Sequence, residues 1–401
     1  MDGRKVIVRI PILGKQILRQ EKTVCETATM EYIRRNSSIP VPEILGKGIA
    51  PIGPYIIMPW VPGRPLCHLL FSPRDLRLDA SVHAQDRQSA YREMAEITLH
   101  LSLLKFNAIG SLVNNLGNIT VATRPLTFTM NELIRTHGLP LAAFPQQPYT
   151  ISKAYFEHLA QIHLDHIRMQ VSGIIKDETD CRSKLTARFL FLNLVRDHIW
   201  FEQPQGPFPL YCDDFRPSNV RADRETNRVT AAIDWEFAYA APVEFTYAAP
   251  WWLMGENPSL WSTNLEAEMR FYKPRLADFL AAMREREEQL ISEGVMTSAQ
   301  RLSGRMSASI DNGIFWLCLA ARCPGLFDAI YWDYIDQRYY GERSSHDERI
   351  QLLSAEQQDE LNTLTQRKVA ELTPRSRSRP PDPLPYSYVN YELIDVSLKP
   401  M

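Results

Sequence analysis

The sequence lacks an excess of charge of either sign. It has 45 basic and 47 acidic residues, for a formal net charge of −2. Proteins that bind nucleic acid or an anionic membrane surface usually carry a clear basic surplus. We therefore predict neither a nucleic-acid partner nor a membrane partner.

Long apolar runs and closely spaced cysteines are also missing. The apolar residues 313–321 end at Arg322 and are too few to cross a bilayer. Arg9 and Pro11 interrupt the apolar residues near the N-terminus, so no signal-peptide core is present. The six cysteines are scattered and include no C-x-x-C pair, which fits a reducing compartment. We predict a cytoplasmic protein.

Two further site types are not supported. The G-x-x-x-x-G-K-[ST] signature of P-loop enzymes is absent. His158, His163 and His166 are spaced by five and three residues, which does not place all three on one face of a helix. We expect surface or core histidines there rather than a zinc site. Cys318 and Cys323 are expected to pack in the core.

The pattern of apolar residues predicts an α+β protein. Residues 5–12 and 54–61 are expected to be strands, and residues 21–35 a helix that ends before two prolines. Most of the remaining chain has helical periodicity. The expected helices there are one at 87–106, two within 151–200 with a break near 177–180, and one from 263 onward, whereas 113–150 is rich in loop residues and 229–233 forms a short strand.

This order predicts a small sheet-containing lobe and a larger, mainly helical lobe. We place the N-terminal lobe at 1–64 and the C-terminal lobe at 65–372. Residues 373–401 begin T-P-R-S-R-S-R-P-P and predict a mobile, basic tail.

One group of residues has the composition of a phosphoryl-transfer site. Asp214 stands five residues before Asn219, and Asp234 follows the apolar strand 229–233. Phosphoryl transfer needs a base beside the acceptor hydroxyl and oxygen ligands for Mg²⁺. An isolated D-x-x-x-x-N is usually only a turn or a cap. The motif at 214–219 gains weight because further segments of a phosphoryl-transfer site occur with it in the expected order along the chain.

These segments resemble a known family. Protein kinases carry H-R-D-x-x-x-x-N followed by D-F-G, and aminoglycoside and choline phosphotransferases carry a related H-x-D-x-x-x-x-N followed by I-D-W. This chain has C-D-D-F-R-P-S-N at 212–219 and I-D-W-E-F-A-Y-A at 233–240. It is similar to the aminoglycoside phosphotransferase-like family, in the fungal-type branch that has C-D-D in place of H-G-D. The segments at 38–42 and 109–112 share the resemblance, which spans roughly residues 5–370.

The resemblance implies a protein kinase-like fold. It also implies an enzyme that uses ATP and Mg²⁺ to phosphorylate a hydroxyl of a small molecule. Asp214 would be the catalytic base, and Asn219 and Asp234 would be the metal ligands.

Further residues of the nucleotide site follow from the same resemblance. Arg9 would contact the α- and β-phosphates and pair with Glu26, although Glu21 and Glu31 compete for that role. Arg216 would contact phosphate, and residues 57–60, including Met58, would form the hinge beside adenine.

The sequence also departs from the family pattern. Cys212 and Asp213 replace the usual His and Gly, and we expect Asp213 to accept backbone N–H groups rather than act as a second base. Only residues 1–5 precede the first strand, so we expect a truncated N-terminal lobe without the nucleotide-covering hairpin. An alternative function is therefore that of a non-catalytic, kinase-like binding or scaffold protein. Trp251 and Trp252 line an acceptor pocket or pack in the core; the sequence leaves both readings open.

Overall fold

The computed structural model describes residues 5–72, 82–170, 175–197, 201–342 and 345–372. The predicted tail at 373–401 lies outside these residues. Residues 1–4, which precede the first strand and on which the expected absence of a nucleotide-covering hairpin rests, also lie outside them. No helix in the described ranges combines the length and the apolar character needed to span a bilayer.

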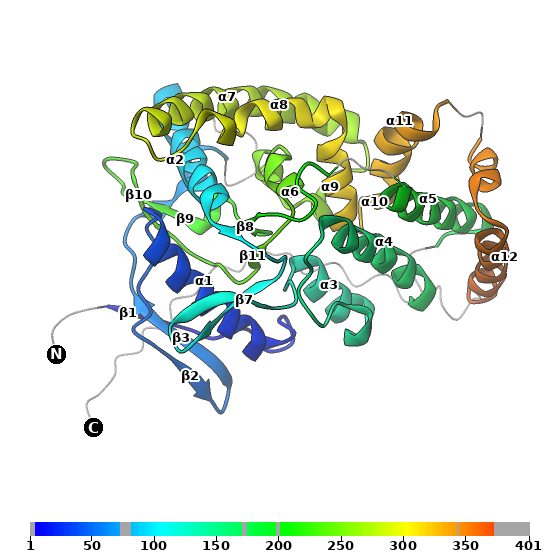
Figure 1. The fold of residues 1–401 in the computed structure, drawn as a ribbon, viewed down its shortest axis with the longest axis horizontal. Helices are drawn as coiled ribbons and strands as arrows, with labels where there is room; N and C mark the ends of the chain where they lie inside the picture. Colours follow the sequence, from blue (N-terminus) through cyan, green and yellow to red (C-terminus); the bar gives the residue numbers. More distant parts are fainter. Residues whose placement is uncertain (1–4, 73–81, 171–174, 198–200, 343–344, 373–401) are drawn as a thin grey trace.

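The N-terminal lobe is a three-stranded antiparallel sheet with one helix. Its strands β1 (Val6–Arg9), β3 (Gly53–Pro59) and β2 (Gly46–Ala50) lie in the order β1-β3-β2, and helix α1 (Arg19–Asn36) packs on β3. Side chains along β3 alternate between buried and half-buried, because one face of the sheet packs against the core. Figure 1 shows this lobe at the lower left of the molecule.

Helix α1 has an unusual buried face, because Lys22 and Glu26 are each only 3% exposed. Residues four apart in a helix lie on the same face. A buried lysine and a buried glutamate each need a partner of opposite charge. The helix therefore presents two ionisable groups to the interior of the protein.

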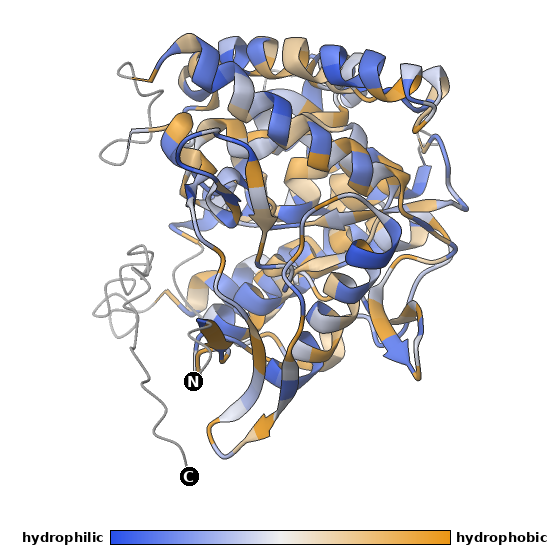
Figure 2. Ribbon diagram, turned by 90° about the vertical axis from the view of Figure 1, so that its left-hand side faces the viewer, coloured by the Kyte–Doolittle hydropathy of each residue, from blue (hydrophilic) through white to orange (hydrophobic). Residues whose placement is uncertain are grey.

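The C-terminal lobe is mainly helical and holds most of the core. Its longest helices pack in pairs: α2 (Ala84–Leu103) contacts α7 (Leu265–Ser292), and α4 (Ser152–Met169) contacts α5 (Glu178–Asp197). In Figure 2 the helices alternate hydrophilic and hydrophobic residues, as expected of helices that bury one face. The other helices are α3 (Phe128–His137), α6 (Val243–Tyr247), α8 (Ser303–Asn312), α9 (Ile314–Arg322), α10 (Phe327–Ile330), α11 (Asp336–Tyr340) and α12 (Ala355–Ala370).

Two small sheets hold the segment with the predicted catalytic residues. Strand β8 (Phe208–Cys212) pairs with β11 (Ala238–Ala240) and β5 (Lys105–Phe106). Strand β9 (Val220–Ala222) pairs with β10 (Val229–Ala232) and β4 (Arg64–Pro65). Residues 213–219 connect β8 to β9, so both of their ends are fixed by strand pairing.

The predicted α+β class and the division into a small sheet lobe and a larger helical lobe are confirmed. The predicted break near 177–180 is also present, because α4 ends at Met169 and α5 begins at Glu178. The segment 113–150, predicted to be rich in loop residues, also contains regular structure. That segment contains a hairpin of β6 (Ser111–Asn115) and β7 (Asn118–Thr123), and then α3. The Asn-rich signal comes from the tight turn, where Leu116 and Gly117 both have positive φ.

Candidate active site

Backbone hydrogen bonds bring the two halves of the predicted site together. The N–H of Ile233 donates to the carbonyl of Asn219 at 2.9 Å, and the N–H of Asp213 donates to the carbonyl of Phe237 at 3.1 Å. The 213–219 loop and the segment after β10 are therefore neighbours. These two hydrogen bonds join residues that are fourteen and twenty-four positions apart in the sequence, and they place Asp214, Asn219 and Asp234 in one region.

Asp214 and Asn219 are linked directly. The Asn219 Nδ2 donates to the backbone oxygen of Asp214 at 2.9 Å and to its Oδ2 at 3.3 Å. The Arg216 Nε lies 3.1 Å from Asp214 Oδ1, an ion pair by distance without hydrogen-bond geometry. Asn219 uses its nitrogen in this way, and its Oδ1 has no partner among the residues that the structure describes.

Burial raises the pKa of Asp214 to about 7. Arg216 opposes the shift as a nearby cation, Asp234 and Glu236 reinforce it as nearby anions, and the hydrogen bond from Asn219 opposes it. A carboxyl group that titrates near neutral pH is suited to accept and release a proton during a reaction.

Asp234 has a backbone conformation that residues other than glycine rarely adopt, with φ of 65°. The next residue anchors the turn: the Trp235 indole N–H donates to the carbonyl of Ala232 at 3.1 Å, and its ring stacks on Phe215 with the centroids 6.2 Å apart. The bent backbone is therefore held in place by a buried aromatic side chain.

Arg9 connects the two lobes at this point. Its guanidinium pairs with Glu26, lies 2.5 Å from Asp234 Oδ1 and 3.1 Å from Glu236 Oε2. The structure thus selects Glu26 as the partner on α1. Of the two other candidates, Glu21 pairs with Arg124 and Glu31 pairs with Lys47.

Burial also raises the pKa of Glu26 to about 7. Arg9 opposes this shift, while Asp234 and Glu236 add to it. Three carboxylates around one guanidinium leave the group with a surplus of negative charge. Such a surplus is suited to a site that receives a cation.

Sequence reasoning missed two charged residues of the site, Lys22 and Glu236. The Lys22 Nζ lies 3.0 Å from Glu236 Oε2 and 4.0 Å from the centre of the Phe237 ring. Gln16 donates to both Glu236 oxygens at 2.9 Å. Burial lowers the pKa of Lys22, and Glu236 opposes that shift. The sequence spacing could have indicated both residues. Lys22 lies four residues before Glu26, on the same face of α1, and Glu236 lies two residues after Asp234.

Met58 lies in β3, paired in register with Ile7, and its side chain is buried in the core. Only its backbone could face a nucleotide, as the hinge prediction requires. Next to it, the N–H of Trp60 already donates to the carbonyl of Lys5 at 3.0 Å.

Asp213 faces away from this group and supports the C-terminal lobe. Its carboxylate accepts the N–H of Phe128 at 3.0 Å and the hydroxyl of Tyr239 at 3.2 Å, and lies 3.4 Å from Arg322 Nη1. The expected role as an acceptor of backbone N–H is confirmed. The neighbouring Cys212 is a buried thiol whose pKa is raised by burial, so it is not an activated nucleophile.

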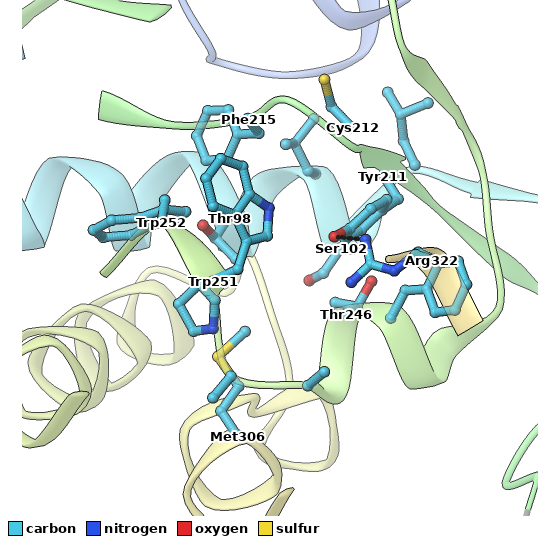
Figure 3. A pocket seen from close by; sticks show the side chains of 16 residues that line it. Thr98, Ser102, Tyr211, Cys212, Phe215, Thr246, Trp251, Trp252, Met306 and Arg322 are labelled. Carbon is cyan, nitrogen blue, oxygen red and sulfur yellow. Dashed lines mark hydrogen bonds between the residues drawn. The ribbon is translucent and has the colours of Figure 1, made fainter. Parts of the chain in front are cut away.

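Two cavities lie on either side of Arg322. The smaller cavity, of about 60 Å³, is lined in part by β8. Figure 3 shows Tyr211, Trp251, Trp252 and Arg322 around it. The Arg322 Nη1 donates a hydrogen bond of 2.5 Å to the Tyr211 hydroxyl. The larger, of about 220 Å³, lies between α3, residues 251–259 and the end of α9. Trp252 packs in the core, whereas Trp251 is buried and also borders both cavities.

The histidines of α4 take no part in this site. His163 and His166 are buried, and His163 packs on Phe327 with the ring centres 4.5 Å apart. In the described ranges no group of three or more His, Cys, Asp or Glu side chains is arranged to hold a metal by itself. Mg²⁺ does not require such a group, because it is commonly held by one or two protein ligands together with phosphate and water.

The two-lobed fold, with an Asp–Asn loop beside an arginine that is surrounded by carboxylates, is typical of phosphoryl-transfer proteins. A family model described as the phosphotransferase enzyme family (APH) matches residues 2–288. This match covers well over half of the 401 residues, and the chain belongs to that family.

Solved structures with low sequence identity are also similar to this chain. One is a candidate aminoglycoside phosphotransferase from Ralstonia eutropha JMP134, with 12% identity, a TM-score of 0.43, and coverage of 92% of this chain and 88% of that one. Another is the GDP complex of aminoglycoside 2'-phosphotransferase-IIIa, with 12% identity, a TM-score of 0.40, and coverage of 91% and 86%. Similarity at this level transfers no substrate to this chain. No curated protein sequence matches it significantly.

Proposed function

We propose that this protein is an ATP- and Mg²⁺-dependent phosphotransferase that transfers the γ-phosphoryl group to a hydroxyl of a small molecule. The observation that carries the proposal is the pairing of Arg9 with both Glu26 and Asp234, beside the Asp214–Asn219 loop. A cation, its orienting glutamate and the acidic loop come from three separate parts of the chain, and the fold joins them.

The residues present fit a hard divalent cation. Asn219 Oδ1 and the Asp234 carboxylate are oxygen donors of the kind that Mg²⁺ prefers. The Asn219 side chain is already oriented by its hydrogen bonds to Asp214, which leave Oδ1 for a ligand. When bound, Mg²⁺ would neutralise charge on the phosphates of the nucleotide.

Asp214 would act as the base. It would take the proton of the acceptor hydroxyl while the acceptor oxygen forms a bond to the γ-phosphorus and the bond from that phosphorus to the β–γ bridging oxygen breaks, releasing ADP. Arg9 would hold the phosphates, and Arg216 would offset charge near the transferred group. Glu26 would orient the guanidinium of Arg9. Met58 would lie in the hinge beside adenine.

Two features support a cytoplasmic location and membership of the fungal-type branch of the family. All six cysteines are free thiols, as expected for a reducing, cytoplasmic environment. The C-D-D sequence at 212–214 supports the fungal-type branch of the family.

A thermal-shift titration with ATP and MgCl₂ tests the proposal. Wild type should be stabilised by the two ligands together, and Asp234→Ala should lose that stabilisation because it removes a metal ligand. Asp214→Asn should retain it, because the base does not hold the nucleotide. Identical curves for wild type and Asp234→Ala would instead indicate a non-catalytic, kinase-like binding protein.

A further inference from the structure

The larger cavity is bordered by the residue that precedes the proposed base. Asp213 lies on its wall, directly before Asp214 in the chain. Phe128, whose N–H donates to the Asp213 carboxylate at 3.0 Å, also lines the cavity and packs edge-to-face on Phe237 with the ring centres 5.4 Å apart. Phe237 in turn follows Glu236, which belongs to the acidic group around Arg9. The cavity therefore adjoins the 213–219 loop at Asp213.

The size of the cavity limits what it can hold. Its volume is about 220 Å³. A closed apolar cavity of about 150 Å³ already binds benzene, whereas sites for drug-sized ligands span about 300–1,000 Å³. The space is thus sufficient for one ring with a short hydroxyl-bearing arm. A molecule of several linked sugar rings would extend beyond this space.

The charges of the wall are already balanced. Two carboxylates line the cavity, Glu132 and Asp213. Glu132 Oε2 lies 2.8 Å from Arg135 Nη2, and Asp213 is paired with Arg322. A ligand with several ammonium groups needs surplus carboxylates, because each buried charge requires a partner. This wall has no such surplus among the residues that the structure describes.

Other polar groups of the wall suit a single neutral hydroxyl. Asn257 Oδ1 accepts from the N–H and hydroxyl of Ser259, at 3.0 and 2.8 Å, and its amide nitrogen has no partner within the described ranges. Burial lowers the pKa of His137, so its ring adds no positive charge at neutral pH. The remaining wall is largely apolar, with Phe128, Leu133, Trp251, Pro258, Leu319 and Pro324.

We propose that this cavity binds the acceptor, and that the acceptor is an uncharged alcohol with a single apolar or aromatic ring rather than a polycationic aminosugar. This inference rests on the proposed phosphotransferase function, because it names the substrate class of the same site. The apolar wall would bury the ring, and the hydroxyl would point toward the catalytic loop.

Saturation-transfer NMR on the full chain tests the proposal with two probes, 2-phenylethanol and the aminoglycoside kanamycin. Ser259 is exposed and lines the cavity, so Ser259→Trp should block its entrance. Ser298→Trp is the matched control, because Ser298 is exposed and lines neither cavity. Thr136→Trp, on α3, is a second blocking variant, because Thr136 also lines the cavity.

We expect 2-phenylethanol to give a signal with wild type and Ser298→Trp, and at least a fivefold weaker signal with both blocking variants. Kanamycin should give none. Binding of kanamycin instead of the alcohol, binding of neither probe, or an alcohol signal that the blocking variants leave unchanged would each overturn the proposal. Stabilisation by ATP and MgCl₂ is measured in parallel on every variant. It shows that each variant is folded, and its absence from wild type would refute the phosphotransferase function separately.

Discussion

Asp213 and Asp214 are adjacent carboxylates with different surroundings. Asp213 accepts hydrogen bonds from Phe128 and Tyr239 in the C-terminal lobe, whereas Asp214 contacts Asn219 and Arg216 on the 213–219 loop. These different partners explain why Asp213 has a structural role and Asp214 the proposed catalytic role. Substitutions of the two residues should therefore have different effects.

Asp214→Asn should lower the rate of phosphoryl transfer by about 100-fold or more, the range attributed to a general base. Asp213→Asn should instead lower the free energy of unfolding by about 1–3 kcal/mol, because the amide nitrogen cannot accept the hydrogen bonds that the lost oxygen received. Turnover assays and urea unfolding of both variants measure this. A large stability loss in Asp214→Asn with normal turnover would reverse the assignment.

Glu26 should make stability depend on pH. Its pKa is about 7 in the folded protein and near 4.5 in the unfolded chain. Between these values the folded state holds a proton that the unfolded state has released, so this group's contribution to stability falls as pH rises and is lost above about 7. Buried His163 and His166 act in the opposite direction, because burial lowers their pKa values.

Without nucleotide or metal, Glu26→Gln should gain stability relative to wild type as the pH rises from about 5 to 7, and the gap should then stay constant. Urea unfolding at several pH values measures the gap. A gap that does not change with pH would mean that Glu26 is ionised throughout.

At the scale of secondary structure, the turn between β10 and β11 combines an unusual backbone with a proposed metal ligand. Asp234 has φ of 65°, a conformation that costs about 1–2 kcal/mol for most side chains and nothing for glycine. Asp234→Gly and Asp234→Ala should both lose stabilisation by ATP and MgCl₂. Only the alanine variant should carry the backbone cost, so it should unfold at the lower urea concentration. Equal stability of the two would show that the turn changes its conformation.

Helix α1 is linked to the turn by Lys22 as well as by Glu26. Lys22→Met removes both the cation–π contact with Phe237 and the ion pair with Glu236, which retains Arg9 and Gln16 as partners. We expect weaker stabilisation by ATP and MgCl₂, because α1 positions Glu26 and thereby Arg9. Thermal-shift titration measures the effect. Lys47→Met is the matched control, since Lys47 pairs with Glu31 on the exposed side of the helix, and an equal effect in both variants would contradict the role of Lys22.

At the scale of the whole molecule, several contacts join the lobes. The N–H of Ala232 donates to the carbonyl of Pro40 at 2.7 Å, and Arg9 reaches Asp234. A ligand held by both lobes should therefore stabilise them together. With MgATP at about 100 times its dissociation constant, the free energy of unfolding should increase by about 2.7 kcal/mol. Calorimetry should show one transition that moves to higher temperature, and movement of only part of a split transition would show that one lobe binds alone.

The sequence predicted the parts of the site that are local in the chain. Asp214 and Asn219 are five residues apart, and their proposed roles follow from one short motif. The choice of Glu26 over Glu21 and Glu31 needed the structure, because all three lie on one helix and only packing decides which one faces Arg9. The larger cavity could not be predicted at all, since α3, residues 251–259 and the end of α9 meet only in the folded chain.

The pairing of Arg9 also has a consequence for the order of binding. Its guanidinium is shared by Glu26, Asp234 and Glu236, so an incoming nucleotide competes with three acidic side chains for the guanidinium. Bare ATP would bring further negative charge into a site that already has a surplus of it. Bound Mg²⁺ would lessen that repulsion, because it offsets part of the negative charge of the phosphates. We therefore expect the nucleotide and its metal to enter this enzyme as one unit, so that the concentration of the complex, rather than that of free ATP, sets the occupancy.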